Sequence, residues 1–246
     1  MAKRARKTKK QQHQHQQDHY NGNVIQINAH RKRHVQIVPR NLAQEDYVEL
    51  LDDNRRNIVF AMGPAGTGKT LLGVLAAIDA YNNNLCSKIV ITRPAVSVDE
   101  QHGFLPGTLV EKMAPWTRPI FDVMEEYWSP STIENMINEN IIEIAPLAYM
   151  RGRTFKNSWI IADEMQNATP SQMKMLLTRI GENSKIIVTG DLAQHDRGFE
   201  DNGLKNFVNL LEQKGSKIIG VVSFTKGDVE RHIAVTEVLT IYGDEE

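Results

Sequence analysis

The segment that most constrains this chain is a glycine-rich octapeptide that fits the pattern G-x-x-x-x-G-K-[ST] of a phosphate-binding loop. Its residues are Gly63, Pro64, Ala65, Gly66, Thr67, Gly68, Lys69 and Thr70. The apolar run 57–62 before it predicts a strand, and the apolar run 71–78 after it predicts a buried helix. In this order the glycines let successive N–H groups point at one anion, and the helix start adds its positive end. We therefore expect the chain to fold around a phosphate site.

Two side chains of the octapeptide suggest which phosphate-bearing ligand binds there. Lys69 can reach the β- and γ-phosphates of a nucleotide, and Thr70 can ligate Mg²⁺. We expect residues 63–70 to bind ATP together with Mg²⁺. The alternative is a glycine-rich turn that ends in Lys-Thr by coincidence, and the flanking strand and helix argue against it.

From Asn41 onward, short apolar runs alternate with helical stretches. The runs cover residues 57–62, 88–92, 158–162, 185–189 and 217–223. Buried runs separated by helices predict a parallel sheet covered on both faces, which is an α/β three-layer sandwich with about five strands. The long segment 94–157 should carry extra helices and functional loops.

Two local signals precede the octapeptide. Asn41, with Gln44 three residues further on, is a capping arrangement that predicts a helix through Leu51. Residues 35–38 alternate between apolar and polar side chains, and this alternation predicts a short strand.

Composition and charge divide the chain into two parts. At 246 residues and 41% apolar content, the chain can bury one sizeable core. Residues 1–34 are rich in Lys, Arg, Gln and His and should form a disordered arm, which leaves 35–246 as a single domain. Residues 1–40 hold ten Lys or Arg and one Asp or Glu. Residues 41–246 hold 19 Lys or Arg and 29 Asp or Glu. A basic arm on an acidic body suggests a polyanionic partner such as nucleic acid; the alternative is a solvated tail without a specific partner.

Cysteine usage and hydropathy suggest where the protein works. Cys86 is the only cysteine, so no disulfide can form within the chain, and its apolar neighbours predict a buried thiol. No apolar run reaches the length of a membrane span, and the basic N-terminus lacks the apolar segment of a signal peptide. We expect a cytoplasmic protein that is not bound to a membrane.

An acidic pair follows the third apolar run. Asp163 comes directly after residues 158–162, at the place where a phosphate-loop protein holds Mg²⁺ with an aspartate. Glu164 follows it and can polarise a water for attack on the γ-phosphate. The pair favours nucleotide hydrolysis over transfer of the phosphoryl group to a small molecule. The alternative is an acidic pair that only caps a helix.

A third polar motif ends the fourth apolar run. Residues 188–194 should open on the same edge of the sheet as the octapeptide and the acidic pair, because ligands bind at that edge in folds of this kind. Gln194 is a candidate sensor of the γ-phosphate. The alternative for Gln194 is a loop side chain that faces solvent.

Together these motifs carry a resemblance. Residues 63–70, 163–167 and 190–194 look like motifs I, II and III of superfamily 1 helicases. The resemblance is narrowed by four further stretches, which are residues 92–96, 103–107, 151–154 and 228–232. Their order and spacing resemble the PhoH-like family of P-loop ATPases over residues 41–242. Met165, Leu192 and Ile233 depart from the residues usual in that family, and none of them carries an expected catalytic role.

The resemblance implies a function and an arrangement of the site. It implies ATP hydrolysis, association into rings, expected to be hexamers, and in some members the unwinding of RNA or single-stranded nucleic acid. It also implies the order 5-1-4-3-2 for the predicted strands. Gln44 occupies the place of the adenine-reading glutamine; the alternative is a helix residue that contacts no ligand.

The length of the chain bears on the arginine that completes such an ATP site. Superfamily 1 helicases complete the ATP site with a second core that supplies an arginine, and 246 residues leave no room for that core. We therefore expect a neighbouring copy to supply the arginine. Arg231 is the first candidate and Arg197 the second. The alternative for Arg231 is an ion pair with Asp228 or Glu230.

A further group of side chains suits contact with a nucleic acid. Its basic members are Arg93, Arg151, Arg153 and Lys156, and its aromatic members are Phe104, Tyr149 and Phe155. Arginine interleaved with aromatic rings can neutralise a single-strand backbone and stack on its bases. The alternative is that Arg93 or Arg153 pairs with acids of the body.

Three functions remain open at this point. The leading interpretation is an ATPase that acts on RNA or single-stranded DNA, with helicase activity as one form of it. A P-loop kinase for a small molecule is the second, and a nucleotide-gated nucleic-acid-binding scaffold without turnover is the third. The acidic pair and Gln194 argue against the kinase.

Overall fold

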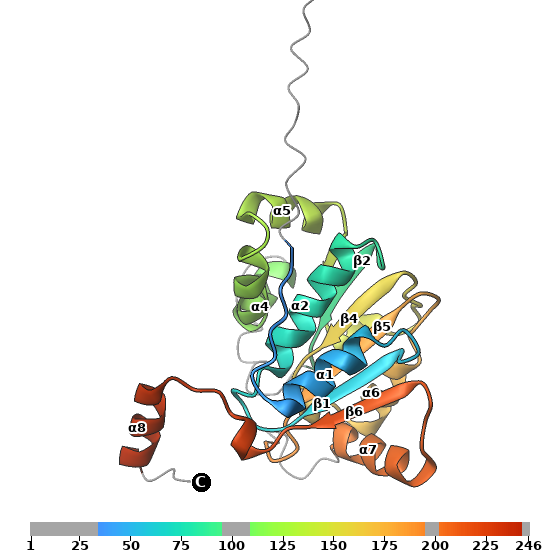
Figure 1. Cartoon of the computed structure of the whole chain (residues 1–246). Helices are drawn as coiled ribbons and strands as arrows, with labels where there is room; N and C mark the ends of the chain where they lie inside the picture. Colours follow the sequence, from blue (N-terminus) through green and yellow to red (C-terminus); the bar gives the residue numbers. More distant parts are fainter. Residues whose placement is uncertain (1–33, 95–108, 195–201, 243–246) are drawn as a thin grey trace, which may run out of the picture. The chain divides into compact units, whose positions relative to one another are not determined.

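The computed structural model describes residues 34–94, 109–194 and 202–242 (Figure 1). The basic arm expected over residues 1–34 lies outside this part of the chain, apart from its last residue. The strands are β1 (Ile58–Met62), β2 (Lys88–Thr92), β3 (Ile142–Ile144), β4 (Ser158–Ala162), β5 (Lys185–Gly190) and β6 (Ile219–Ser223). No helix in the described part of the chain combines the length and apolar character that a membrane crossing requires.

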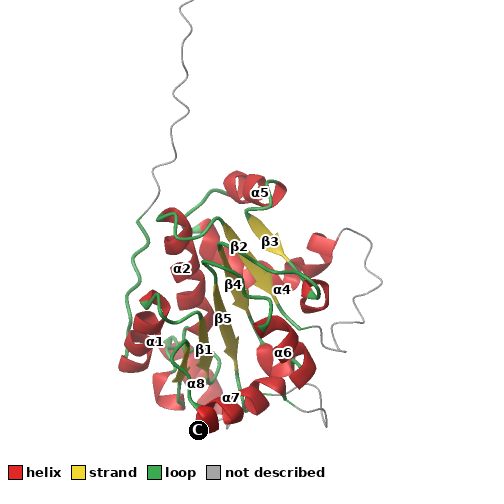
Figure 2. Cartoon of the chain, turned by 90° about the vertical axis from the view of Figure 1, so that its right-hand side faces the viewer, coloured by secondary structure: helices red, strands yellow, loops and turns green. Residues whose placement is uncertain are grey.

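All six strands belong to one sheet, in the order β3-β2-β4-β5-β1-β6. Every pairing is parallel, and Figure 2 shows β1, β5, β4, β2 and β3 side by side. The predicted order is confirmed for the five expected strands, but the sheet has one more strand than expected. The additional strand, β3, covers only Ile142–Ile144 and carries the charged Glu143 at its centre. A three-residue run interrupted by a charge gives too little periodicity to be recognised in the sequence.

Helices cover both faces of this sheet. The α-helices are α1 (Leu42–Asp52), α2 (Lys69–Asn82), α4 (Leu109–Glu125), α5 (Pro130–Asn138), α6 (Pro170–Leu177), α7 (Gly203–Lys214) and α8 (Ile233–Tyr242). Short 3₁₀ turns are η2 (Leu147–Met150), η3 (Met165–Asn167) and η4 (Lys226–Asp228). Helices α4 and α5 lie in the long segment 94–157, together with β3 and η2.

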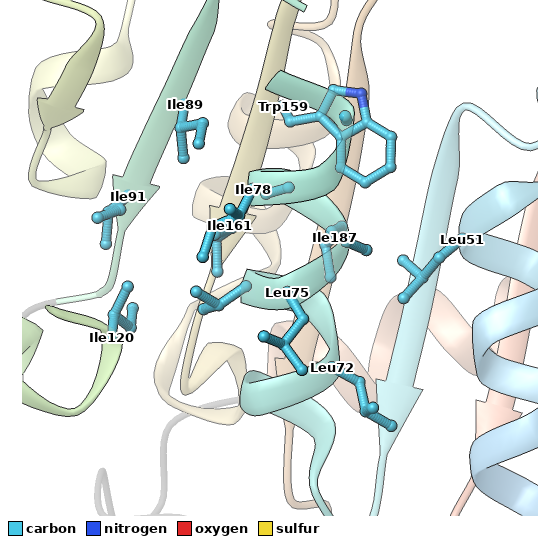
Figure 3. Packing of buried hydrophobic residues seen from close by; sticks show 14 of the residues in the cluster. Leu51, Leu72, Leu75, Ile78, Ile89, Ile91, Ile120, Trp159, Ile161 and Ile187 are labelled. Atoms are coloured by element: carbon cyan, nitrogen blue, oxygen red, sulfur yellow. The ribbon is translucent and has the colours of Figure 1, made fainter. Parts of the chain in front are cut away.

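Two apolar cores separate the three layers. One core joins α1, α2, α4 and α5 to the sheet, and Figure 3 shows Leu75 and Ile78 of α2 near Ile161 and Ile187. The other core joins η2, α6 and α7 to the opposite face. Successive strand residues point to opposite faces, so Val59 enters the first core and its neighbour Phe60 the second. Covering on both faces explains why β1, β4 and β5 are buried along their whole length.

The segment before β1 matches one local prediction and contradicts another. The side chain of Asn41 accepts a hydrogen bond of 2.9 Å from the Gln44 N–H and caps α1, as predicted. Residues 35–38 do not form the expected strand; they stay irregular, and Val35 is buried in the core beside α1 and α2. A strand needs a neighbour to pair with, which the short alternation in the sequence could not reveal. Cys86 is buried, as expected.

Candidate nucleotide-binding site

The octapeptide 63–70 joins the carboxyl end of β1 to the start of α2. Gly63, Gly66 and Gly68 have φ values of +144°, +86° and +81°, which side chains rarely allow. A Cβ atom at Gly63 would lie 2.4 Å from the Phe224 carbonyl oxygen, so this position also requires glycine for space. The backbone thus has the curled path that the phosphate-loop pattern predicts.

Lys69 lies folded over this loop. Its Nζ donates hydrogen bonds to the carbonyl oxygens of Gly63, at 2.7 Å, and Pro64, at 2.6 Å. Burial lowers the pKa of Lys69, and the nearby carboxylate of Asp191 offsets part of that shift. Nζ also donates to the Thr67 hydroxyl at 3.2 Å. An ammonium held by neutral oxygens and partly desolvated is suited to exchange those partners for an anion.

Three oxygen-bearing side chains meet beside the loop. The Thr70 hydroxyl donates to Asp163 Oδ1 at 2.8 Å, and the Thr189 hydroxyl donates to the same atom at 2.5 Å. Hydroxyl and carboxylate oxygens are donors that Mg²⁺ prefers, so Thr70 and Asp163 fit the metal expected here. Thr189 was not among the expected site residues. Its signal is a hydroxyl at the end of a buried strand, directly before Gly190.

Glu164 follows Asp163 in an unusual conformation. Its φ of +54° and ψ of +39° are left-handed, which costs a residue with a Cβ about 1–2 kcal/mol. Such conformations gather at functional sites, where the surrounding structure holds them in place. Oε2 of Glu164 accepts a hydrogen bond of 2.5 Å from Gln166 Nε2.

Predicted residues from three strand ends line one cavity of about 310 Å³, whose lining does not include Gly63, Pro64 or Thr67. Its lining comprises Ala65, Gly66, Gly68, Lys69, Thr70, Leu71, Asp163, Glu164, Thr189, Gly190, Asp191 and Gln194. Lys69, Thr70, Asp163, Glu164 and Gln194 are therefore brought together, as the motif spacing suggests. Gln194 is exposed at the rim, on the loop that follows β5. The glycine loop, the ammonium and the hydroxyl–carboxylate pair together fit a nucleotide phosphate chain with Mg²⁺.

Gln44 lies behind the loop and not in the cavity. Its side chain is 4% exposed. Its Oε1 accepts a hydrogen bond of 2.9 Å from the Arg40 N–H, and its Nε2 donates at 3.1 Å to the Thr67 carbonyl. Both ends of the amide are thus bonded within the protein, in contacts that support the loop. Adenine reading by Gln44 stays a prediction.

Arg231 lies beside the phosphate loop of its own chain. A Cβ atom at Gly66 would be 3.4 Å from Arg231 Nε, and the Glu230 N–H donates to the Gly66 carbonyl at 3.0 Å. The carboxylate of Asp228 accepts from Thr225. Arg231 thus lies near the phosphate loop of its own chain, and its expected role between copies stays a prediction. Arg197 lies outside the described residues.

The candidate nucleic-acid contacts divide into two groups. Arg153 binds Glu143 with both terminal nitrogens, at 2.5 and 2.9 Å, and Lys156 pairs with Glu182 at 3.4 Å. The guanidinium of Arg153 also covers the ring of Phe155, which is buried. These contacts are internal, as the alternative interpretation holds for Arg153.

The second group keeps its polar or aromatic surface available. Arg151 is exposed, and so is Tyr149, at 64%. Arg93 is only half-buried at the end of β2. Phe104 and residues 103–107 lie outside the described residues. Tyr149 and Arg151 are therefore the members of the group best placed to meet a nucleic acid.

Comparison with known proteins identifies the family. The profile of the PhoH-like protein family matches residues 36–243. The chain belongs to the PhoH-like family. The resemblance drawn from the motifs is thereby confirmed, and with it the P-loop architecture of the α/β fold.

Several curated relatives share most of this chain. The PhoH-like protein of Mycobacterium tuberculosis is 43% identical over 220 residues, which cover 89% of this chain and 61% of that protein. The PhoH-like protein of Bacillus subtilis is 43% identical over 205 residues, covering 82% and 63%. Protein PhoH of Escherichia coli is 40% identical over 210 residues, covering 84% and 58%. The chain thus spans 58–63% of the length of these relatives.

Among solved structures, a crystal structure of Bacteroides Pif1 bound to ssDNA is a distant match. It is 16% identical, with a TM-score of 0.35, and the match covers 83% of this chain and 46% of that chain. A likeness this distant carries no argument about function.

Proposed function

We propose that this protein binds ATP with Mg²⁺ and hydrolyses it. The observation that carries the proposal is the convergence of Lys69, the Thr70–Asp163 pair and Glu164 on one cavity at the carboxyl edge of the sheet. Bound Mg²⁺ would neutralise charge on the phosphate oxygens. A cation, metal-type oxygens and a separate carboxylate are the parts that hydrolysis of a nucleoside triphosphate needs.

Each side chain has a distinct task in this proposal. Lys69 exchanges its carbonyl partners for β- and γ-phosphate oxygens. Thr70 and Asp163 hold the metal, while Glu164 accepts a proton from the attacking water. Gln194 at the rim contacts the γ-phosphate, and Arg231 of a neighbouring copy is the first candidate for the arginine that completes the site. Water attacks phosphorus, the bond to the β-phosphate oxygen breaks, and ADP and phosphate leave.

We further propose that hydrolysis is coupled to RNA or single-stranded DNA. Residues 1–40 carry ten Lys or Arg against one acid, which favours a polyanion. Tyr149 and Arg151 offer a ring for base stacking and a cation for the backbone. A scaffold that binds ATP without turnover is the competing function, because the same residues would serve binding alone. A small-molecule kinase has no observation in its favour.

Assembly into a ring stays a prediction. It is supported by α8, whose exposed large apolar side chains are Ile233, Val235, Val238, Ile241 and Tyr242. Several exposed apolar side chains on one helix are typical of an interaction surface. Light scattering on the full chain would distinguish a ring from a monomer.

Phosphate release tests the proposed function. The rate should be measurable with Mg²⁺ and should rise when single-stranded RNA or DNA is added. Glu164→Gln should keep ATP bound but lower turnover by about 10²- to 10⁴-fold, because an amide cannot take the proton. Glu134→Gln, an exposed change on α5, is the matched control and should leave the rate unchanged.

Two outcomes would contradict the proposal. ATP binding without phosphate release, with or without nucleic acid, would favour the scaffold. Wild-type turnover in Glu164→Gln would show that Glu164 is not the base. A rate that ignores both nucleic acids would leave hydrolysis standing and remove the proposed coupling.

A further inference from the structure

One buried amide connects two of the motifs at this site. Gln166 lies in η3, two residues after Glu164, and is 1% exposed. Its Nε2 donates to Glu164 Oε2 at 2.5 Å. Its Oε1 accepts a hydrogen bond of 3.1 Å from the Asp191 N–H, which begins the loop after β5. The two hydrogen bonds make Gln166 a bridge between the acidic pair and the loop 191–194.

The chemistry of the partners fixes the direction of this amide. A backbone N–H can only donate, and an ionised carboxylate can only accept, so Oε1 must face Asp191 and Nε2 must face Glu164. Neither a carboxylate nor a thioether could satisfy both partners. Glutamine is thus the side chain that this position requires.

The backbone of the loop also depends on this bridge. A Cβ atom at Gly190 would lie 2.8 Å from Gln166 Oε1, closer than such atoms approach. Glycine at this position lets the end of β5 pass against the amide, so that the Asp191 N–H can reach it. The approach links η3 to a loop that carries Gln194 at the cavity rim.

We propose that Gln166 is a positioning residue that sets the carboxylate of Glu164 according to the position of the loop 191–194. This inference rests on the proposed ATPase function. Holding Oε2 leaves Oε1 of Glu164 for the attacking water. A displacement of the loop when Gln194 meets the γ-phosphate shifts the Asp191 N–H, and the amide passes that shift to Glu164. The backbone carbonyl of Glu164 accepts from the Asn167 N–H at 3.1 Å, whereas its side chain is held by Gln166.

A purely structural role makes a different prediction. If Gln166 only fastened η3 to β5, the bond to Asp191 would matter and the bond to Glu164 would not. The two ends can be separated by substitution. Gln166→Glu keeps the acceptor for Asp191 and loses the donor to Glu164. Gln166→Met keeps the length of the side chain and loses both.

The experiment measures ATP turnover, ATP affinity and thermal stability for both variants. The expected result is that each lowers kcat by about 10²-fold, the effect of a misplaced catalytic group, without a comparable change in the ATP dissociation constant. Amide exchange at Asp191 should accelerate in Gln166→Met and stay slow in Gln166→Glu. Gln172→Glu is the matched control, because Gln172 occupies a capping box on α6 where glutamate serves equally well.

Each outcome decides for or against the bridge. Wild-type kcat in Gln166→Glu would overturn it, because the bond to Glu164 would then be unused. If only Gln166→Met loses kcat, and its melting temperature falls as well, Gln166 has a structural role. If Gln166→Glu does not fold, a folded Gln166→Met with normal ATP affinity and wild-type kcat overturns the proposal. A wild-type protein that releases no phosphate overturns the proposed function itself, whereas an active wild type with unaffected variants overturns only this inference.

Discussion

The two ends of β5 bury similar polar groups in different settings. At the amino end, Lys185 is 5% exposed and donates to the carbonyl oxygens of Leu51 and Asp53, beneath the ring of Trp159. At the carboxyl end, the hydroxyl of Thr189 donates to Asp163. Lys69 lies nearby, and its Nζ also donates to backbone carbonyl oxygens. Both lysines are bonded to backbone carbonyls, and burial lowers the pKa of both. A buried amine with a lowered pKa therefore does not by itself mark a functional site.

The two ends differ in the residues that surround each amine. Lys69 is held by a loop whose glycines adopt left-handed conformations, and it lines a cavity together with acids from two other strand ends. Lys185 also lines a cavity, of about 830 Å³, but the described residues that line it include no carboxylate. Lys185 donates to two carbonyls at the end of helix α1, and one of them, that of Asp53, also accepts from the Arg56 N–H. Lys69 can therefore exchange its carbonyl partners for a phosphate. Lys185 faces no such site, so a change there would only remove its hydrogen bonds to the carbonyls. The comparison assigns function to one end of the strand and stability to the other.

The largest expected effect tests this assignment directly. Lys69→Met should weaken ATP binding and lower kcat by about 10²- to 10³-fold, because the charge that faces the phosphates is lost. Lys185→Met should leave kcat and ATP affinity unchanged. Steady-state phosphate release and equilibrium ATP binding measure both variants.

A loss of turnover in Lys185→Met, in a variant that is folded by circular dichroism, would break the comparison. Equal turnover of wild type and Lys69→Met would contradict the functional role assigned to Lys69.

A smaller effect is expected for the hydroxyls at the two ends. Thr189→Val removes the donor to Asp163 and should lower Mg²⁺-dependent turnover by about tenfold, as loss of a group that orients a metal ligand does. Ser184, next to Lys185, accepts from the Ser158 N–H at 3.0 Å and donates to the Phe155 carbonyl at 2.9 Å. Ser184→Ala should instead lower the free energy of unfolding by about 1–3 kcal/mol.

Mg²⁺ titrations of turnover and urea denaturation curves measure these two effects separately. The comparison fails if Ser184→Ala changes the Mg²⁺ dependence, or if Thr189→Val leaves it as in the wild type.

The last expected effect is a pH dependence of stability at the amino end. Burial lowers the pKa of Lys185 from 10.5 to about 8. The unfolded chain therefore binds more protons between these pH values, and stability rises with pH in that window. The difference in unfolding free energy between wild type and Lys185→Met should move in favour of the wild type as the pH rises from about 8 towards 10.5. Denaturation curves of the pair at several pH values measure it, and a difference that stays constant would show that Lys185 titrates normally.

Much of the site could be predicted because local patterns determine it. The octapeptide 63–70 specifies its own turn through its glycines, and the acidic pair 163–164 is placed at the sheet edge by the apolar run before it. The strand order of the five recognised strands followed from the family resemblance. Asn41 caps its helix through a contact only three residues away. In each case the information lies within a few residues or within the succession of strands.

Other features escaped prediction because they depend on contacts between distant residues. Strand β3 is too short to show a period, and it forms because β2 offers an edge to pair with. Arg153 was an expected nucleic-acid contact until Glu143 was placed beside it. Arg231 lies next to Gly66 because the chain after β6 returns across the loop.

The sequence alone thus determined that the glycine-rich loop, the acidic pair 163–164 and the glutamine-bearing loop would share the carboxyl edge of a parallel sheet. Periodicity and residue order suffice for that, because parallel strands end together. Only the tertiary structure decided which atoms meet there. Thr189 reaches Asp163, and Gln166 reaches both Glu164 and Asp191, through the packing of η3 against β5. Such contacts join residues from different strands, and their geometry is set by register and packing, which no local pattern records.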